Sequence, residues 1–322
     1  MKKFLFRFAI CVSIIIMLVS SVGATAMLVP GGQVVGLELQ DDTVTVVAID
    51  DQLGAGAKKG GLEAGDRILR IGKAAIKTAQ DVQQALTSSD GKVEVTVLRS
   101  GKTKKLQILP AVTAQGPKLG VYLKQGTTGL GTITYYDPET KNFGALGHGV
   151  NGTGGSLLSL RRGSVYAADV LSVNKGKIGA PGQLLGTLEA PVAIGSLEKN
   201  TQQGIFGKLQ NPVTEEPLPV AAIDQVKTGK ATIRSTISGD ALKEYSVEIL
   251  KIYPNSRDRC RNFLIKVTDE TLLSQTGGIV QGMSGSPIIQ DGKLVGAVTH
   301  VLVNDPTTGY GIFIENMLEA AA

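Results

Sequence analysis

The sequence predicts a mainly β protein of two domains, the first with both helices and strands and the second built almost wholly of strands. Its 322 residues suit about two domains of ~100–200 residues each. The 41 glycines are spread among short apolar runs, a pattern typical of tight turns between short strands. From about residue 120 onward roughly ten such runs follow one another with almost no helical period, which predicts a β-sandwich or a pair of barrels.

The first 29 residues are expected to direct export. Lys2, Lys3 and Arg7 precede an uncharged apolar run at 8–29, which is about the ~20 residues that span a bilayer. The basic flank would keep the N-terminus inside and the remainder outside. The string ATA at 24–26 has the small-x-small shape of a signal-peptidase site, so an anchor and a cleaved signal both fit. We expect membrane contact through this segment, with residues 30–322 across the membrane from the cytoplasm.

Residues 32–112 are expected to combine short strands with one or two helices. Residues 78–89 have a helical period, with Thr78 as the N-cap and Val82 and Leu86 on one face. The alternation of apolar and polar residues predicts the strands VVGLEL (34–39) and TVTVVAI (43–49), and a hairpin at 92–109 that turns at Ser100-Gly101.

This stretch resembles a PDZ domain of the bacterial protease-associated type. The string Gly-Leu-x-x-Gly-Asp at 61–66 matches the signature turn, and VVGLEL would form the carboxylate-binding loop. A PDZ domain binds an extended peptide by adding it as a strand to a sheet edge. The resemblance places this groove between Gly36-Leu37 and the helix that carries Val82 and Leu86. Ordinary core packing also explains each of these apolar residues taken singly.

A Pro/Gly/polar joint at 113–120, TAQGPKLG, predicts a domain boundary. Beyond it only the last residues, ENMLEAAA, have a helical pattern. The strands expected after the joint are 131–137, 164–173, 189–197, 231–237, 244–253, 262–269, 277–282, 286–290, 293–303 and 310–315.

One serine and one histidine, each flanked by glycine, have catalytic potential. Ser284 lies in the string GMSGSP, ahead of an apolar strand. A serine hydroxyl is a poor nucleophile until a base takes its proton, and the chain has two histidines. His148 has glycine on both sides, which leaves its ring open to approach. The amides of Gly282 and Ser284 can converge on one point, as an oxyanion hole requires.

Two levels of resemblance follow from these strings. GMSGSP fits the Gly-x-Ser-Gly-[Gly/Ser]-Pro pattern around the nucleophile of chymotrypsin-like proteases. More narrowly, the strings at 135–149, 276–306 and 309–318 together resemble the stage IV sporulation protein B serine peptidases, over about residues 28–320. The resemblance implies a PDZ domain at 32–112 followed by a chymotrypsin-like double β-barrel at 116–320.

The resemblance also implies roles for individual residues. Ser284 would be the nucleophile and His148 the general base, with the amides of Gly282 and Ser284 as the oxyanion hole. Ser286 is the rival serine, but it takes the small position ahead of the proline in the matched pattern.

The acid of the triad is less well defined. Asp269 matches the position that the family assigns to it, but fifteen residues before the serine is an odd spacing for a chymotrypsin-like barrel. Asp169 and Asp224 are alternatives, because in a chymotrypsin-like barrel the acid usually lies well upstream of the serine. An exposed residue at the turn after a strand is the other interpretation of Asp269.

The substrate cleft is expected beside the strand that follows the serine. Thr299 and His300 would lie next to the bound peptide, although a partly buried histidine explains His300 equally well. Gly278, six residues before Ser284, would lie near the base of the specificity pocket. No charge stands there, which argues against selection for a basic side chain.

The resemblance implies an exported serine endopeptidase, at first tethered to the membrane, that acts between the forespore and mother-cell membranes. It would cleave the exposed part of a membrane regulatory protein, and so release an intramembrane protease that activates a late sigma factor. It would also cleave itself near the N-terminus, where residues 28–36, LVPGGQVVG, are the expected accessible site. The rival interpretations are a catalytically inactive PDZ scaffold and a structural protein of the envelope.

The composition argues against other classes of function. The sequence has no metal-ligand spacing and no phosphate loop, so it predicts no metal or cofactor. Tryptophan is absent, aromatic residues make up 4%, and the net charge of +5 is scattered, so we expect no nucleic-acid partner. Cys11 in the apolar run and the distant Cys260 suggest no disulfide framework. The expected partners are a protein substrate and a PDZ ligand peptide.

Overall fold

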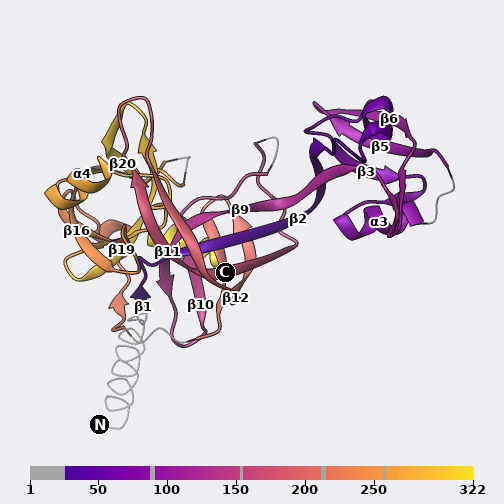
Figure 1. Cartoon of the computed structure of the whole chain (residues 1–322). Coiled ribbons are helices and arrows are strands. Elements are labelled where there is room, and N and C mark those ends of the chain that lie inside the picture. The colour runs from indigo at the N-terminus through magenta and orange to yellow at the C-terminus, as the bar shows by residue number, and fades with distance from the viewer. Residues whose placement is uncertain (1–25, 88–90, 153–154, 212–214, 257–258) are drawn as a thin grey trace, which may run out of the picture.

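The computed structural model describes residues 26–87, 91–152, 155–211, 215–256 and 259–322 (Figure 1). The predicted export segment at 1–29 therefore lies almost wholly outside the described residues. Within these ranges no helix is both long and apolar enough to cross a membrane. The described chain is mainly β, as predicted, and consists of two β-barrels and a smaller α/β unit that extends from the first of them (Figure 1).

The described residues form strands of very different lengths, four short α-helices and one 3₁₀ turn. The strands are β1 (Met27–Pro30), β2 (Val34–Ile49), β3 (Arg67–Ile71), β4 (Ala74–Ala75), β5 (Val93–Arg99), β6 (Lys102–Ile108), β7 (Ala111–Thr113), β8 (Gly116–Lys118), β9 (Val121–Tyr136), β10 (Asn142–Ala145), β11 (Arg162–Asn174), β12 (Gln183–Thr201), β13 (Gly204–Leu209), β14 (Leu218–Pro219), β15 (Gly229–Thr236), β16 (Leu242–Ile252), β17 (Phe263–Val267), β18 (Pro287–Gln290), β19 (Lys293–Leu302) and β20 (Asp305–Phe313). The helices are α2 (Ala55–Lys59), α3 (Ala79–Thr87), α4 (Glu270–Thr276), α5 (Ile314–Ala321) and the 3₁₀ turn η1 (Ile223–Gln225).

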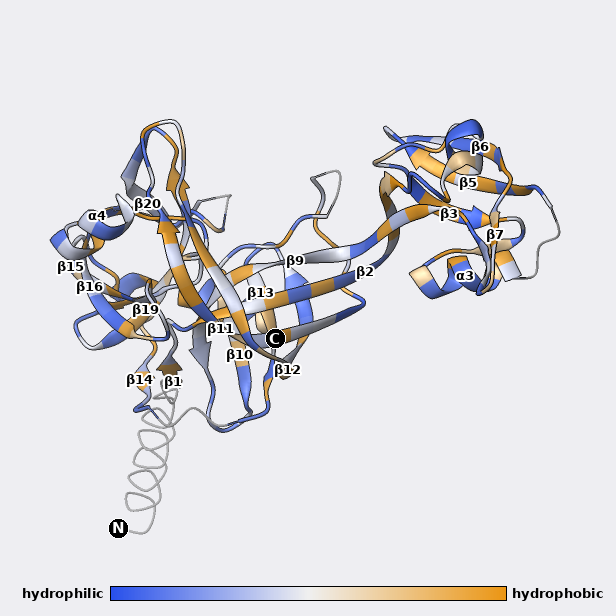
Figure 2. Cartoon of the chain, viewed as in Figure 1, coloured by the Kyte–Doolittle hydropathy of each residue, from blue (hydrophilic) through white to orange (hydrophobic). Residues whose placement is uncertain are grey.

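The first barrel is a ring of six strands. Hydrogen-bonded pairs join β2, β9, β10, β13, β12 and β11 in that order, and β11 pairs with β2 to close the ring. Figure 2 shows polar residues interspersed with apolar ones along β2 and β11, as expected for strands that lie only partly against a core. The buried side chains inside include Leu37, Phe143, Val165 and Ile205.

The second barrel closes in the order β15-β16-β17-β20-β19-β18. Its core contains Phe263 and Phe313, whose rings meet edge to face with centroids 5.2 Å apart. Gly311 of β20 makes room for the first ring, because a Cβ there would lie 2.1 Å from it. Two six-stranded barrels in one chain confirm the predicted double β-barrel.

The α/β unit lies between two strands of the first barrel rather than ahead of it. β2 and β9 leave the barrel as a two-stranded ribbon, and their outer halves, 44–49 and 121–125, pair within this unit (Figure 1). Residues 34–39, predicted as a PDZ strand, instead pair with β9 and β11 in the barrel. Residues 34–39 ahead of the α/β unit therefore belong to the first barrel. The predicted bounds, a PDZ domain at 32–112 followed by a peptidase domain at 116–320, stay a prediction.

The signature string at 61–66 forms a turn that is held by a buried ion pair. Gly61 and Gly65 have left-handed φ angles of 82° and 91°. Asp66 is fully buried, and it accepts hydrogen bonds from the Glu63 amide at 2.9 Å and from Arg99 at 2.6 Å. Burial disfavours the charged carboxylate, but the Arg99 guanidinium and the Glu63 amide outweigh it and lower the pKa of Asp66.

The helix predicted at 78–89 is α3, and its cap is as predicted. The Thr78 hydroxyl accepts the Asp81 amide at 3.1 Å, and the Asp81 carboxylate accepts the Thr78 amide at 2.8 Å. Val82 and Leu86 are buried in the core of the unit. The hairpin of β5 and β6 turns at Ser100-Gly101, where both residues have left-handed φ, as predicted.

Candidate active site

A turn after β10 positions His148 against the second barrel. Leu146 and Gly147 have left-handed φ angles of 68° and 67°, which turn the chain directly after the strand. A Cβ on Gly147 would lie 2.9 Å from the side chains of Thr299 and Ile312. The missing side chain thus lets the histidine turn of the first barrel pack onto β19 and β20.

The turn that carries Ser284 is fitted equally closely to the first barrel. It lies between α4 and β18, and Gly282 and Gly285 have left-handed φ angles of 100° and 98°. A Cβ on Gly285 would lie 2.1 Å from the carbonyl oxygen of Thr132 and 2.5 Å from the amide nitrogen of Leu146. The turns with Ser284 and His148 are therefore in direct backbone contact.

Two threonines of β9 bind the serine turn to the first barrel. The Thr132 hydroxyl donates to the Gly282 carbonyl at 2.7 Å, and the Thr134 hydroxyl donates to the Gly285 carbonyl at 2.8 Å. Both side chains are fully buried. Because buried hydrogen bonds hold their partners in one geometry, the two barrels fix the turn from both sides.

One cleft of about 540 Å³ brings together five of the residues that were predicted for catalysis or for the substrate cleft. Its lining includes His148 from the first barrel and Gly282, Ser284, Thr299 and His300 from the second. The rings of His148 and His300 are in contact there, with centroids 5.1 Å apart and planes tilted by 42°.

The hydrogen bond of His148 defines which ring nitrogen is free. Nδ1 lies 3.0 Å from the carbonyl oxygen of Gly149, which can only accept, so Nδ1 carries the proton. In the neutral ring Nε2 is then the unprotonated nitrogen. Burial lowers the pKa of His148, and the bond to Gly149 opposes this only in part. At neutral pH the ring is therefore neutral, the form that can accept a proton.

The Ser284 hydroxyl donates to the carbonyl oxygen of Thr299 at 2.9 Å. Neither this bond nor that of His148 joins the two side chains. The amides of Gly282 and Ser284 donate to no acceptor among the described residues, whereas the intervening Met283 amide donates to Val280. Gly282 and Ser284 both line the cleft, so their amides are the candidate donors of the oxyanion hole.

The predicted acids do not lie in this cleft. Asp269 is the N-cap of α4, and its two oxygens accept the amides of Leu272 at 3.0 Å and Ser246 at 3.3 Å. Asp169 pairs with Thr187 on the hairpin of β11 and β12, and Asp224 lies in η1. Among the described residues that line the cleft there is no carboxylate.

Gly278, predicted near the base of the specificity pocket, and Ser286, the rival serine, both lie outside the cleft. Gly278 is buried under the carbonyl oxygen of Pro306, and its neighbour Ile279 lines the cleft instead. Ser286, the rival serine, is fully buried and hydrogen-bonded to the Ser235 hydroxyl at 3.1 Å. Ser284 is therefore the serine of the GMSGSP string that faces the cleft.

The predicted peptide groove is not assembled as proposed. Gly36 and Leu37 pair with β11 in the first barrel, whereas Val82 and Leu86 belong to the separate core of the α/β unit. The reason is that VVGLEL forms the barrel half of β2. Strands β3, β4, β8 and β9 all contact α3. Among the described residues the outer half of β9, 121–125, pairs with β2 on one edge only.

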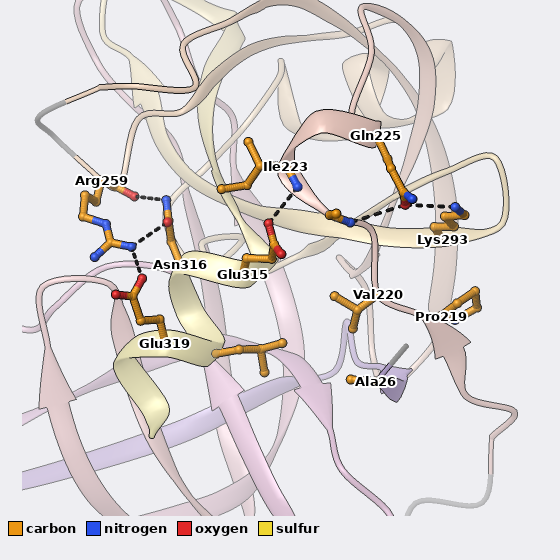
Figure 3. A pocket seen from close by; sticks show the side chains of 12 residues that line it. Ala26, Pro219, Val220, Ile223, Gln225, Arg259, Lys293, Glu315, Asn316 and Glu319 are labelled. Carbon is orange, nitrogen blue, oxygen red and sulfur yellow. Dashed lines mark hydrogen bonds and ion pairs between the residues drawn. The ribbon is translucent and has the colours of Figure 1, made fainter. Parts of the chain in front are cut away.

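A larger pocket of about 790 Å³ lies apart from these residues (Figure 3). Its polar side chains bond one another: Arg259 donates to Asn316 and pairs with Glu319, and Lys293 donates to Gln225 at 3.0 Å. It includes none of the predicted catalytic residues.

Two barrels that join a serine, a neutral histidine and two amide donors in one cleft define a serine endopeptidase, here with an inserted PDZ domain. Residues 115–318 match the family described as SpoIVB peptidase S55, and residues 34–109 match the PDZ domain family. The first match covers well over half of the chain, so this protein belongs to the SpoIVB peptidase S55 family. No curated protein matches the chain.

Solved structures with similarity to the chain include proteases and a PDZ domain. The Rv3671c protease of M. tuberculosis, in its inactive form, is 16% identical over 60% of this chain and 84% of that chain, with a TM-score of 0.36. The active form of the same protease is 16% identical over 61% of this chain and 73% of that chain, with a TM-score of 0.35. The PDZ domain of the SdrC-like protein of Listeria monocytogenes is 26% identical over 26% and 87%, with a TM-score of 0.22.

Some residues of this site are not evident from the sequence. Asn200 bonds the backbone of Val150, two residues after His148, although it lies fifty residues further along the chain. Leu37 and Leu39 of β2 line the cleft, although VVGLEL was predicted as part of the peptide groove. Only the pairing of β2 with β9 and β11 brings these leucines to the cleft, and no local pattern signals it.

Proposed function

We propose that this peptidase hydrolyses its substrate with Ser284 as nucleophile and His148 as general base. The observation that carries the proposal is the shared cleft, which is lined by both Ser284 and His148. The bond of Nδ1 to Gly149 leaves Nε2 of His148 as the unprotonated nitrogen of the neutral ring. The amides of Gly282 and Ser284 are the donors for the oxyanion. For the reaction the serine hydroxyl turns from the Thr299 carbonyl toward His148.

The chemistry then proceeds in two halves. Ser284 Oγ attacks the carbonyl carbon of the scissile peptide while Nε2 of His148 takes the hydroxyl proton, and the two amides stabilise the negative oxygen. Collapse of the tetrahedral intermediate breaks the C–N bond, and His148 returns the proton to the leaving amine. Water, deprotonated by the same nitrogen, hydrolyses the acyl-enzyme and restores both groups.

The proposed substrate is the extracytoplasmic part of a membrane regulatory protein in sporulation signalling. The family supports this role, and the basic and apolar residues at the start of the sequence support export. The proposed location is the space between the forespore and mother-cell membranes, with the N-terminal segment as the tether. The PDZ domain would recruit a peptide tail by strand addition to residues 121–125 of β9, near α3, on the edge opposite to the one that pairs with β2.

Self-cleavage near the N-terminus is part of the proposal, but the accessible site predicted at 28–36 needs correction. Leu28 and Val29 are 4% and 1% exposed in β1, which pairs with β14 and β9. The amides of Gly31 and Gly32 donate to β9. A protease needs an extended, unpaired segment in its cleft, so we place self-cleavage before Leu28.

The test compares full-length wild type with Ser284→Ala. We expect the wild type to hydrolyse quenched fluorescent casein and to shorten by a defined mass, and the variant to do neither. Ser286→Ala is the matched control, because it removes the same hydroxyl from a buried site two residues away. Hydrolysis that persists in Ser284→Ala, or is lost only in Ser286→Ala, would overturn the proposal.

A further inference from the structure

We propose that Asn200 is a positioning residue that holds His148 in its base-competent tautomer through the peptide bond between Gly149 and Val150. The proposal rests on His148 as the general base. Asn200 lies at the end of β12, on the strand of the first barrel that pairs with β13. Its side chain is half-buried and reaches the histidine turn rather than the substrate.

The side chain of Asn200 binds the backbone on both sides of Val150 and also the backbone of Leu158. Its Oδ1 accepts the Val150 amide at 2.9 Å, and its Nδ2 donates to the carbonyl oxygens of Val150 and Leu158, both at 2.8 Å. The side chain thus uses its acceptor and one of its donor bonds on Val150, two residues after His148, and its other donor bond on Leu158. Such a fully satisfied amide has one favourable orientation, so it fixes the backbone that it binds.

The bond to Val150 matters because of what lies on the other side of the same peptide plane. The Val150 N–H and the Gly149 C=O belong to one planar unit and point in opposite directions. The Gly149 oxygen is the acceptor of His148 Nδ1–H at 3.0 Å. A hydrogen bond from Val150 N–H to Asn200 therefore orients that carbonyl toward the ring, and it also polarises the oxygen as an acceptor.

This arrangement supplies what a serine peptidase needs from a third group. A histidine acts as a base only if its outer nitrogen is unprotonated, and the hydrogen bond of the other nitrogen decides which tautomer is present. No carboxylate among the described residues lines the cleft to do this. A second backbone bond, from the Gly149 amide to Gln202 at 3.1 Å, holds the same turn from the loop that follows Asn200.

The test measures the tautomer directly and separately from activity. In full-length protein labelled with ¹⁵N-histidine, long-range ¹H–¹⁵N spectra distinguish a protonated Nδ1 from a protonated Nε2, and the chain has only two histidines to assign. His300→Gln provides the assignment. Asn200→Ala is compared with Asn174→Ala, which makes the same change at an exposed strand end.

We expect wild type and Asn174→Ala to show His148 protonated at Nδ1 and free at Nε2, at a pH where the ring is neutral. Asn200→Ala should show the other tautomer in a substantial fraction, with kcat lowered about 10²-fold and KM unchanged. The proposal is overturned if wild-type His148 is protonated at Nε2, or if folded Asn200→Ala keeps both the tautomer and kcat. The wild-type spectrum decides the matter even if Asn200→Ala does not fold.

The same experiment separates this inference from the proposed function. If wild type has the Nδ1-protonated ring, and Asn200→Ala shifts it, but Ser284→Ala still hydrolyses casein, then Asn200 orients His148 and the assigned nucleophile is wrong. If Ser284→Ala is inactive and Asn200→Ala has the wild-type tautomer and kcat, the nucleophile stands and the inference fails.

Discussion

Gly285→Ala should separate the two halves of the catalytic site. A Cβ there would lie 2.1 Å from the Thr132 carbonyl oxygen, and real Cβ atoms essentially never approach closer than 3.0 Å. The serine turn and the Thr132 backbone must therefore separate by roughly 0.9 Å, the difference between these two distances. The obstacle is backbone that belongs to the first barrel, so the serine turn and the histidine turn must move apart.

The expected loss follows from that displacement. A misplacement of about 1 Å in a catalytic group costs around 10²-fold in rate, or ~2.7 kcal/mol. The left-handed φ of 98° adds about 1–2 kcal/mol of backbone strain to the folded state. We therefore predict that kcat/KM on quenched casein falls about 100-fold, and that the melting temperature falls by several degrees.

Gly292→Ala is the matched control for this experiment. Gly292 lies in the turn between β18 and β19 of the same barrel and has a left-handed φ of 73°, and a Cβ added there would meet no atom within 4 Å. It therefore carries the backbone strain without the steric displacement, and should lower stability while kcat/KM stays within about threefold of wild type. If folded Gly285→Ala is as active as Gly292→Ala, the argument from barrel contact is refuted.

Three other outcomes follow from buried or capping groups. Because burial lowers the pKa of His148, kcat/KM should be retained as the pH falls through 6.5 and lost only at lower pH, when the ring gains a proton; a titration limb above 6.5 contradicts this. Asp66→Ala leaves Arg99 without its buried partner and should destabilise the PDZ domain by about 3–5 kcal/mol in denaturant unfolding. In wild type the contribution of Asp66 to the free energy of unfolding is fully present above the unfolded pKa of 3.8, and it is lost as the pH falls through the lower pKa of the folded state. A free energy of unfolding that rises on acidification would argue against this. Asp269→Ala should cost about 1 kcal/mol as a lost helix cap, and Asp269→Asn should keep stability and kcat/KM; an asparagine variant without activity would restore the aspartate as the acid.

The features that the sequence predicts correctly depend on local chemistry. Thr78 and Asp81 signal a helix start because the bonds of an N-cap join residues only three positions apart. Ser100-Gly101 signals a hairpin because both positions need left-handed φ. Ser284 and His148 are found because each lies in a glycine-rich turn whose backbone must pass close to another segment.

The features that the sequence misses depend on distant pairing. Residues 34–39 are apolar enough for either a PDZ strand or a barrel strand, and only their pairing with β11, some 130 residues later, decides between them. Residues 277–282 look like a strand, but Gly277 ends helix α4 with a left-handed φ of 74°. Asn200 has no local signal at all, because its role arises from the closure of the barrel.

The most direct test of the central claim is to find which side chain is activated as a nucleophile. Full-length protein is treated with a fluorophosphonate, digested and mapped by mass spectrometry, with His148→Ala and Ser286→Ala treated in parallel. We predict one adduct on Ser284 in wild type and in Ser286→Ala, and almost none in His148→Ala. An adduct on another serine, or labelling of Ser284 that does not depend on His148, would contradict the account.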